Sequence, residues 1–348
     1  MLALRVFDWQ FRANPVYRRY AEGRGATPES VRSWEDVPAV PAAAFKHLPL
    51  ISGEGGAVER VFRTSGTTAG RRRGEHHVPS LALYRASLLP TFRAHVLPDG
   101  VPLSFISLIP SPMRQPDSSL STMVGLAMEA FGTSDSGWFA EGERLDVERL
   151  GEALRASERS GRPALVLGTA FAFVHWLDAQ AASEAAPFRL PAGSRVLETG
   201  GFKGRSRAVS RTELYAALAE GLGIGPEWIV NEYGMTELLS QYYEGGLGQP
   251  TGSEVPLAQA LEERRLVGPP WLRFRILDPV TLEPLPDGER GLVAHFDLAN
   301  VGSVAAVLTE DVGFADAGGL KLLRRAPGAE PRGCSVAMDE LLSAAEEA

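Results

Sequence analysis

The chain has 348 residues, of which 44% are hydrophobic and 22% charged, the proportions of an ordinary globular protein. Its formal charge of −8 argues against a nucleic-acid-binding protein, whose surface would be basic. No apolar run reaches the roughly 20 residues that a membrane-spanning helix needs, and the start of the chain lacks the apolar core of a signal peptide. A single cysteine, Cys334, cannot form an internal disulfide, so we expect a cytoplasmic protein of two or three subdomains.

The first predicted elements are a helix, an extended connector and a second helix. Residues 1–25 carry apolar side chains on roughly one helical face and stop at Gly23-Arg24-Gly25. The prolines within residues 37–41 favour an extended backbone, because each disfavours the helical region for the residue before it. The next helix is predicted over residues 80–92, with Ser80 as its N-cap.

Strands and helices alternate through the middle of the chain. Strands are predicted at residues 103–109, 164–168, 194–199 and 228–233, and helices at residues 145–160, 171–180 and 212–221. This order favours an α/β fold with a mostly parallel sheet. Ligands bind such sheets where strands end and loops begin, so we expect a site after the third and fourth of these strands.

The pattern changes near residue 266. Side chains alternate in residues 271–277 and 291–298, on either side of a turn at Leu285-Pro286-Asp287-Gly288, which predicts a β-hairpin in a small antiparallel subdomain. The predicted regions are therefore an α/β core at 1–265, a small β subdomain at 266–326 and a short C-terminal tail at 327–348.

Residues 62–73 read Phe-Arg-Thr-Ser-Gly-Thr-Thr-Ala-Gly-Arg-Arg-Arg, a segment rich in hydroxyl side chains, glycine and arginine. Glycine lets a backbone approach a ligand closely, and hydroxyl and backbone N–H groups donate to phosphate oxygens. The spacing is not that of the common P-loop, and residues 200–206 do not match that motif either. Taken alone, the composition leaves two interpretations open, a phosphate-binding loop or a polar surface turn.

Two further stretches carry side chains suited to a nucleotide. In residues 231–237, Tyr233 offers a flat face for a purine, Thr236 can donate to a phosphate, and Glu237 is a hard oxygen ligand suited to Mg²⁺. Later in the chain, Asp311 precedes a predicted turn and can accept hydrogen bonds from both ribose hydroxyls. Each stretch also has a simpler interpretation as a strand end or turn, which for Asp311 alone is the preferred one.

Together these motifs resemble those of the adenylate-forming superfamily of acyl and aryl ligases. Its signatures are a Thr-Ser-Gly-Thr-Thr-Gly loop, a Tyr-Gly-x-Thr-Glu strand end and a late Thr-x-Asp. Within it the chain looks most like the acyl-protein synthetases, the LuxE-like enzymes that activate fatty acids for bioluminescence. The segments that carry this resemblance are Phe45-Lys46, residues 64–70, His76-His77, and residues 198–204, 231–241 and 332–334.

The resemblance implies the large N-terminal domain of an adenylate-forming enzyme, with its phosphate loop at residues 62–73. A carboxylate would attack the α-phosphate of ATP to give an acyl-adenylate and pyrophosphate. The β- and γ-phosphates would lie against Thr64, Ser65, Gly66, Thr67, Thr68 and Gly70. The adenine would lie against Gly200, Gly201 and Tyr233, followed along the chain by Gly234 and Met235. Thr236 would contact the α-phosphate, Glu237 the Mg²⁺ and Asp311 the ribose, so ATP and Mg²⁺ are the expected cofactors.

The sequence also departs from the superfamily pattern. Ala69 stands where the loop usually has glycine, and His76 and His77 follow the loop, where they can touch phosphate or the acyl carboxylate. Larger relatives carry a mobile C-terminal domain that supplies a lysine, and here we expect that swivelling domain to be reduced or absent. Lys203 and Lys321 are the candidates for the lysine, although a solvated surface charge is the commoner role of a lysine.

Cys334 is the candidate acyl acceptor. In the luminescence enzymes the acyl group moves onto a cysteine near the C-terminus, and cations near a thiol lower its pKa and favour the nucleophilic thiolate. The alternative is that Cys334 is a small buried side chain. The substrate would be a small-molecule carboxylate with a fatty acyl group, and an acyl-acceptor protein such as a reductase is a candidate partner. Two rival functions stay open, an aryl-carboxylate or aryl-CoA ligase of a natural-product pathway and a non-catalytic adenylate-binding module.

Overall fold

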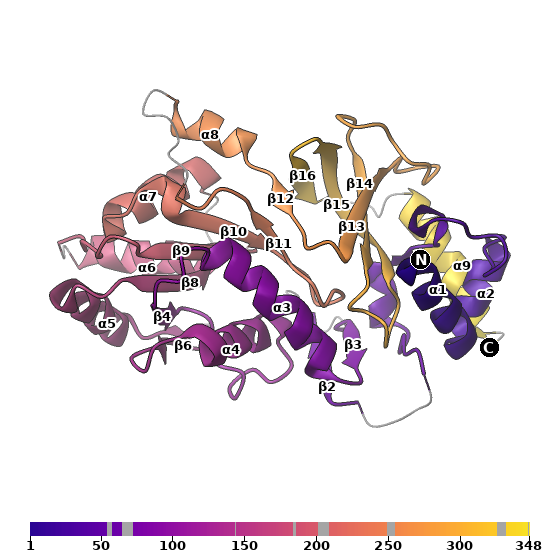
Figure 1. Ribbon diagram of the computed structural model, residues 1–348, viewed down its shortest axis with the longest axis horizontal. Helices are drawn as coiled ribbons and strands as arrows, with labels where there is room; N and C mark the ends of the chain where they lie inside the picture. The colour runs from indigo at the N-terminus through magenta and orange to yellow at the C-terminus, as the bar shows by residue number, and fades with distance from the viewer. Residues whose placement is uncertain are drawn as a thin grey trace. The chain divides into compact units, whose positions relative to one another are not determined.

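Figure 1 shows the computed structural model of the chain. The structure describes residues 1–53, 58–64, 72–142, 144–183, 186–200, 209–248, 255–325, 332–346 and 348. Contacts between Cα atoms group the chain into two compact units. Unit 1 comprises residues 1–87, 235–241 and 267–348, and unit 2 comprises residues 88–234 and 242–266. The regions predicted from the sequence follow chain order, whereas these contacts join both ends of the chain in unit 1.

Unit 2 contains a mostly parallel sheet, as the alternating pattern predicts. Its strands, in spatial order, are β5 (Gly137–Trp138), β4 (Ser104–Ser107), β8 (Ala164–Thr169), β9 (Arg195–Thr199), β10 (Ile229–Tyr233) and β11 (Tyr242–Glu244). The strands from β5 to β10 pair in parallel, and β11 pairs antiparallel with β10. The carboxyl ends of β9 and β10 therefore lie side by side (Figure 1). Both carry a predicted adenine-binding residue, because Gly200 follows β9 and Tyr233 ends β10.

Helices cover both faces of this sheet. They are α3 (Leu81–Val96), α4 (Ser119–Phe131), α5 (Val147–Ser160), α6 (Ala170–Ala182), α7 (Arg211–Leu222) and α8 (Leu257–Glu263). On one face Leu154 of α5, Phe173 of α6 and Leu218 of α7 pack in one core cluster with Val166 of β8. The predicted helices at 145–160, 171–180 and 212–221 are confirmed. The sequence analysis missed α4, because its residues are nearly all apolar or small and show no polar stripe.

Unit 1 contains an antiparallel sheet, a separate two-stranded hairpin and helices from both ends of the chain. Its strands are β1 (Val40–Pro41), β2 (Arg60–Arg63), β3 (Glu75–Val78), β13 (Leu272–Leu277), β14 (Gly291–Asp297), β15 (Ala306–Asp316) and β16 (Gly319–Arg325). Strands β13 to β16 pair in order, β1 adds to β15 in parallel, and β2 and β3 form a separate hairpin. The predicted hairpin at 271–277 and 291–298 is β13 and β14.

The helices of unit 1 come from both ends of the chain. They are α1 (Leu2–Ala13), α2 (Pro15–Gly23) and α9 (Arg332–Glu346). The single helix expected in residues 1–25 is interrupted at Asn14, whose side chain accepts a hydrogen bond from the Tyr17 N–H at 3.0 Å and caps α2. The tail packs as α9 in the same core cluster as α2, through Met338 and Leu341.

The remaining short elements are β6 (Ala140–Glu141), β7 (Arg144–Leu145), β12 (Leu266–Val267) and the 3₁₀ helices at Trp34–Asp36, Ala42–Lys46 and Pro226–Trp228. Within the part of the chain that the structure describes, no helix is both long and apolar enough to span a membrane.

Candidate functional site

The hairpin of β2 and β3 holds the two ends of the predicted phosphate loop. The Thr64 N–H donates to the Gly74 carbonyl oxygen at 2.9 Å, and the Gly74 N–H donates back to the Thr64 hydroxyl at 2.9 Å. The Arg73 guanidinium also donates to the Thr64 carbonyl oxygen at 2.6 Å. Thr64 therefore closes the base of the loop, and its hydroxyl keeps a proton to donate to a ligand. The other predicted phosphate contacts, Ser65, Gly66, Thr67, Thr68 and Gly70, lie outside the described residues.

His76 joins this hairpin to the segment that carries Thr236 and Glu237, within unit 1. Its Nδ1 lies 2.8 Å from the Thr236 carbonyl oxygen, and because a carbonyl only accepts, Nδ1 carries the proton. Burial lowers the pKa of His76 to about 4, so the imidazole is neutral at neutral pH. The ring of Phe45 packs edge-on against it. The sequence analysis placed His76 near phosphate or carboxylate, whereas the structure makes it a buried link between two motifs.

Residues 235–241 are also held from the end of β14. Asp297 accepts hydrogen bonds from the Leu239 N–H at 2.9 Å and from the Ser240 hydroxyl at 2.7 Å. The Asn300 amide donates to the Glu237 carbonyl oxygen at 2.8 Å. Both side chains are fully buried. Neither residue was predicted to support the site. Their usable signal was that both are polar and lie at or near the end of the apolar strand β14.

The peptide groups of Thr236 and Glu237 are thus fixed by different partners, His76 and Asn300. The side chain of Thr236 is partly exposed and Met235 packs beside the core cluster of unit 1. This fixes the backbone on which the predicted α-phosphate and Mg²⁺ ligands stand.

Glu237 is the predicted magnesium ligand, and it is 8% exposed. Among the residues that the structure describes, no three His, Cys, Asp or Glu side chains are grouped to hold a metal ion. Nucleotide-bound Mg²⁺ takes most of its ligands from phosphate and water and needs only one or two carboxylates. Glu237 supplies one such carboxylate, so it stays the predicted ligand.

The predicted ribose ligand, Asp311, lies within β15 rather than before a turn. Its N–H donates to the Thr309 hydroxyl at 3.1 Å, and the Thr309 hydroxyl donates to the Val293 carbonyl oxygen at 2.8 Å. The expected turn is wrong because residues 306–316 continue as one strand of the antiparallel sheet. Asp311 is partly exposed, and its role with ribose stays a prediction.

Cys334 lies on α9 in the core cluster of unit 1 and is 2% exposed. Its Sγ is 3.9 Å from the Thr309 carbonyl oxygen. The structure therefore favours the buried interpretation of this side chain over an exposed thiolate. Arg324 and Arg325 precede Cys334 in the sequence and are candidates for cations near its thiol, but their side chains lie outside the described part of the chain.

In unit 2, Gly200 and Tyr233 lie at the carboxyl ends of neighbouring strands. Gly200 is exposed and has φ +68°, a conformation that favours glycine, and a Cβ there would meet nothing within 4 Å. Tyr233 ends β10, with its ring 6.0 Å from that of Tyr242, and the exposed Gly234 follows it. Gly201 and Lys203 lie outside the described residues.

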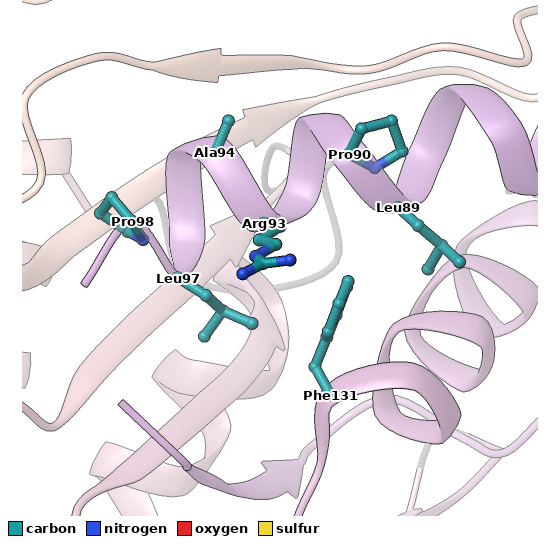
Figure 2. A pocket seen from close by; sticks show the side chains of 7 residues that line it. All are labelled: Leu89, Pro90, Arg93, Ala94, Leu97, Pro98 and Phe131. Atoms are coloured by element: carbon teal, nitrogen blue, oxygen red, sulfur yellow. The ribbon is translucent and has the colours of Figure 1, made fainter. Parts of the chain in front are cut away.

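A separate open pocket of about 550 Å³ lies beside α3 in unit 2. It is lined by α3 between Leu89 and Leu97, by Pro98 and by Phe131 of α4. Figure 2 shows the side chain of Arg93 extending from α3 toward the side of the pocket on which Phe131 lies. None of the described residues predicted to bind the nucleotide lines this pocket.

The fold is that of the adenylate-forming ligases. The chain is similar to an open conformation of a 2-hydroxyisobutyryl-CoA ligase in complex with 2-HIB-AMP and CoA, with a TM-score of 0.62 and 16% identity. The likeness covers 93% of this chain and 72% of that one.

The sequence places the chain within this class. The model of the acyl-protein synthetase family, LuxE, matches residues 2–343, and the chain belongs to that family. It is 22% identical over 350 residues to the long-chain-fatty-acid–luciferin-component ligase of Vibrio harveyi. This similarity covers 97% of this chain and 86% of that protein. The ligase of the same name from Aliivibrio fischeri is 21% identical, over 90% of this chain and 78% of that protein.

Proposed function

We propose that this protein uses ATP to activate a carboxylic acid as an acyl-adenylate and then transfers the acyl group to a nucleophile on a protein. Membership of the acyl-protein synthetase family supports this reaction. The two relatives are named as ligases that join a long-chain fatty acid to a luciferin component, so a long-chain fatty acid is the proposed substrate.

The proposed reaction has two steps. In the first, a carboxylate oxygen of the acid forms a bond to the α-phosphorus of ATP, and the bond from that phosphorus to the bridging oxygen breaks to release pyrophosphate. In the second, a nucleophile attacks the acyl carbon, the acyl–oxygen bond breaks and AMP leaves. The first step needs positioning and charge neutralisation more than covalent help from the protein.

The observation that carries this proposal is the hydrogen bond from His76 to the Thr236 carbonyl oxygen. It joins, within unit 1, the hairpin that bears the two ends of the hydroxyl-rich loop to Met235-Thr236-Glu237, the last three residues of the second motif. Two motifs far apart in the sequence are thereby held together, as a shared triphosphate site requires.

The chain's own residues have separate roles in this proposal. The loop from Thr64 to Gly70 donates hydrogen bonds to the β- and γ-phosphates, and Thr236 donates to the α-phosphate. Glu237 holds Mg²⁺, which when bound neutralises phosphate charge. In unit 2, Gly200, Gly201 and Tyr233 contact the adenine, and in unit 1 Asp311 accepts from the ribose.

Two thiols are proposed as acceptors of the acyl group. Cys334 can take the acyl group only after α9 moves, because its thiol is packed in the core of unit 1. A thiol of a partner protein, such as a reductase, is the alternative acceptor. Lys203 is proposed as the cation that contacts the carboxylate and the α-phosphate.

ATP–pyrophosphate exchange across a panel of fatty and aromatic acids tests the first step. We expect exchange with long-chain fatty acids, and Thr68→Ala lowers it at least about tenfold by removing a donor to phosphate. Thr281→Ala, a matched change in an exposed turn, leaves exchange unchanged. Exchange with aromatic acids alone would instead indicate an aryl ligase, and binding of ATP without exchange for any acid would indicate a non-catalytic module.

A further inference from the structure

Two buried glutamates stand at the ends of adjacent strands in unit 2. Glu198 of β9 is 4% exposed and Glu232 of β10 is 3% exposed. In the parallel register, Asn231 lies opposite Glu198, and Glu232 lies opposite Thr199. Because side chains alternate along a strand, the two glutamates lie on opposite faces of the sheet.

Glu198 lies in a network that contains cations. It accepts hydrogen bonds from the Asn231 amide and from the Tyr215 hydroxyl. The Arg211 guanidinium bonds to the same Tyr215 hydroxyl and pairs with Glu244. The carboxylates on this face therefore have positive charge near them, as buried carboxylates usually do.

Glu232 differs from Glu198 because, among the described residues, no arginine, lysine or histidine pairs with it. Its carboxyl accepts a hydrogen bond from the Thr199 hydroxyl. A buried carboxyl whose described partners include no countercharge costs free energy, and this favours a role for Glu232 other than stability.

The position of this bond provides the explanation. Thr199 is followed directly by Gly200, and Glu232 is followed directly by Tyr233. The side-chain bond therefore joins the two residues that precede the proposed adenine contacts. It adds to the backbone pairing at the last register position of β9 and β10, where fraying of the strands would otherwise begin.

We infer that Glu232 and Thr199 are positioning residues for the nucleotide base, and that their hydrogen bond fixes the separation of Gly200 and Tyr233. This inference rests on the proposed function, since it assumes that ATP binds at these two strand ends. Neither side chain needs to touch the base. Loss of the bond loosens the base site and leaves the phosphate contacts proposed in unit 1 intact.

The test compares variants that remove the bond with variants that keep it. Valine has nearly the same shape as threonine but no hydroxyl, so Thr199→Val removes the donor. Thr199→Ser keeps the hydroxyl donor, and Glu232→Gln keeps an oxygen acceptor. Thr133→Val is the matched control, because it also removes a hydrogen bond from a threonine hydroxyl to a carboxylate, that of Asp135. The Thr133 hydroxyl also bonds to Leu103, which precedes β4, so this control lies at the amino end of a strand and not at the carboxyl end.

We expect Thr199→Val to raise the Kd for ATP, measured by calorimetry, and the KM for ATP in exchange about tenfold. The KM for the acid and the kcat change less than twofold, and Thr199→Ser, Glu232→Gln and Thr133→Val stay near wild type. Circular dichroism checks that each variant is folded.

Two results would overturn the inference in different ways. ATP binding that Thr199→Val leaves unchanged, or an equal loss in kcat and in KM for both substrates, would overturn the positioning role alone. Failure of the wild-type protein to bind ATP would overturn both this inference and the proposed function.

Discussion

The Nδ1–H of His76 donates to the carbonyl oxygen of Thr236 at 2.8 Å, across 160 residues of sequence. The imidazole is 1% exposed, so no water replaces this bond if the ring is removed. The hairpin and the segment from Met235 to Gln241 thus hold each other in position through a neutral side chain.

His76→Phe should therefore weaken both folding and the first step. Phenylalanine fills the space of the ring but leaves a buried carbonyl without its donor, which costs roughly 1–3 kcal/mol. We expect ATP–pyrophosphate exchange to fall at least about tenfold. His175→Phe, on the exposed face of α6, is the control and should change nothing. Wild-type exchange by His76→Phe would show that the link has no role in the reaction.

Asp297→Ala should destabilise unit 1. The Leu239 N–H and the Ser240 hydroxyl would both lose a buried acceptor, so we expect the free energy of unfolding to fall by roughly 3 kcal/mol in denaturant titrations. Asp287→Ala, in an exposed turn, is the comparison and should stay within about 0.5 kcal/mol of wild type. A similar small effect for Asp297→Ala would mean that this carboxyl does not support the segment.

Glu232 should make stability depend on pH. Burial raises the pKa of Glu232 from its usual value of 4.5 to about 7, so between these pH values the folded protein holds a proton that the unfolded chain has released. Its contribution to stability is complete below pH 4.5 and is lost as pH rises through 7. Glu232→Gln removes this dependence.

The advantage in stability of Glu232→Gln over wild type should thus grow by as much as about 3 kcal/mol between pH 4.5 and pH 8, as measured by urea unfolding at each pH. The comparison has to be between variant and wild type, because the lowered pKa of His76 has the opposite sign. A constant difference across this pH range would contradict the prediction.

Cys334 should react slowly with thiol reagents. Because it is the only cysteine, its alkylation by iodoacetamide reports on one site. We expect the native rate to be at least about a hundredfold below the rate in urea, since reaction requires local opening of α9. Faster labelling in the presence of ATP and a fatty acid would support the proposed movement of α9. A stable acyl-enzyme formed by Cys334→Ser would exclude the acceptor role.

The parallel sheet of unit 2 could be predicted because short apolar strands alternate with helices that have clear ends, such as α5, which stops at Gly161 with φ +68°. That Asp311 lies within a strand could not be predicted from the sequence. Residues 306–316 contain polar residues that suggest a turn, and only pairing with β14 and β16 keeps them extended.

The candidate site shows the same limit. Composition pointed to the loop, to Tyr233 and to Glu237, because hydroxyl, aromatic and carboxyl groups are what a nucleotide and its metal ion bind. The link from His76 to Thr236 and the support from Asp297 depend on side chains that meet only in the folded chain. No local pattern contains that information.

The packing of α9 beside α2 and the pairing of β1 with β15 have a consequence for how the chain folds during synthesis. All strands of the unit 2 sheet have been made once residue 244 leaves the ribosome, whereas the helices at the start of the chain must wait for Arg332–Glu346. These helices therefore lack part of their packing until late in translation, when exposed apolar side chains favour aggregation or binding by a chaperone.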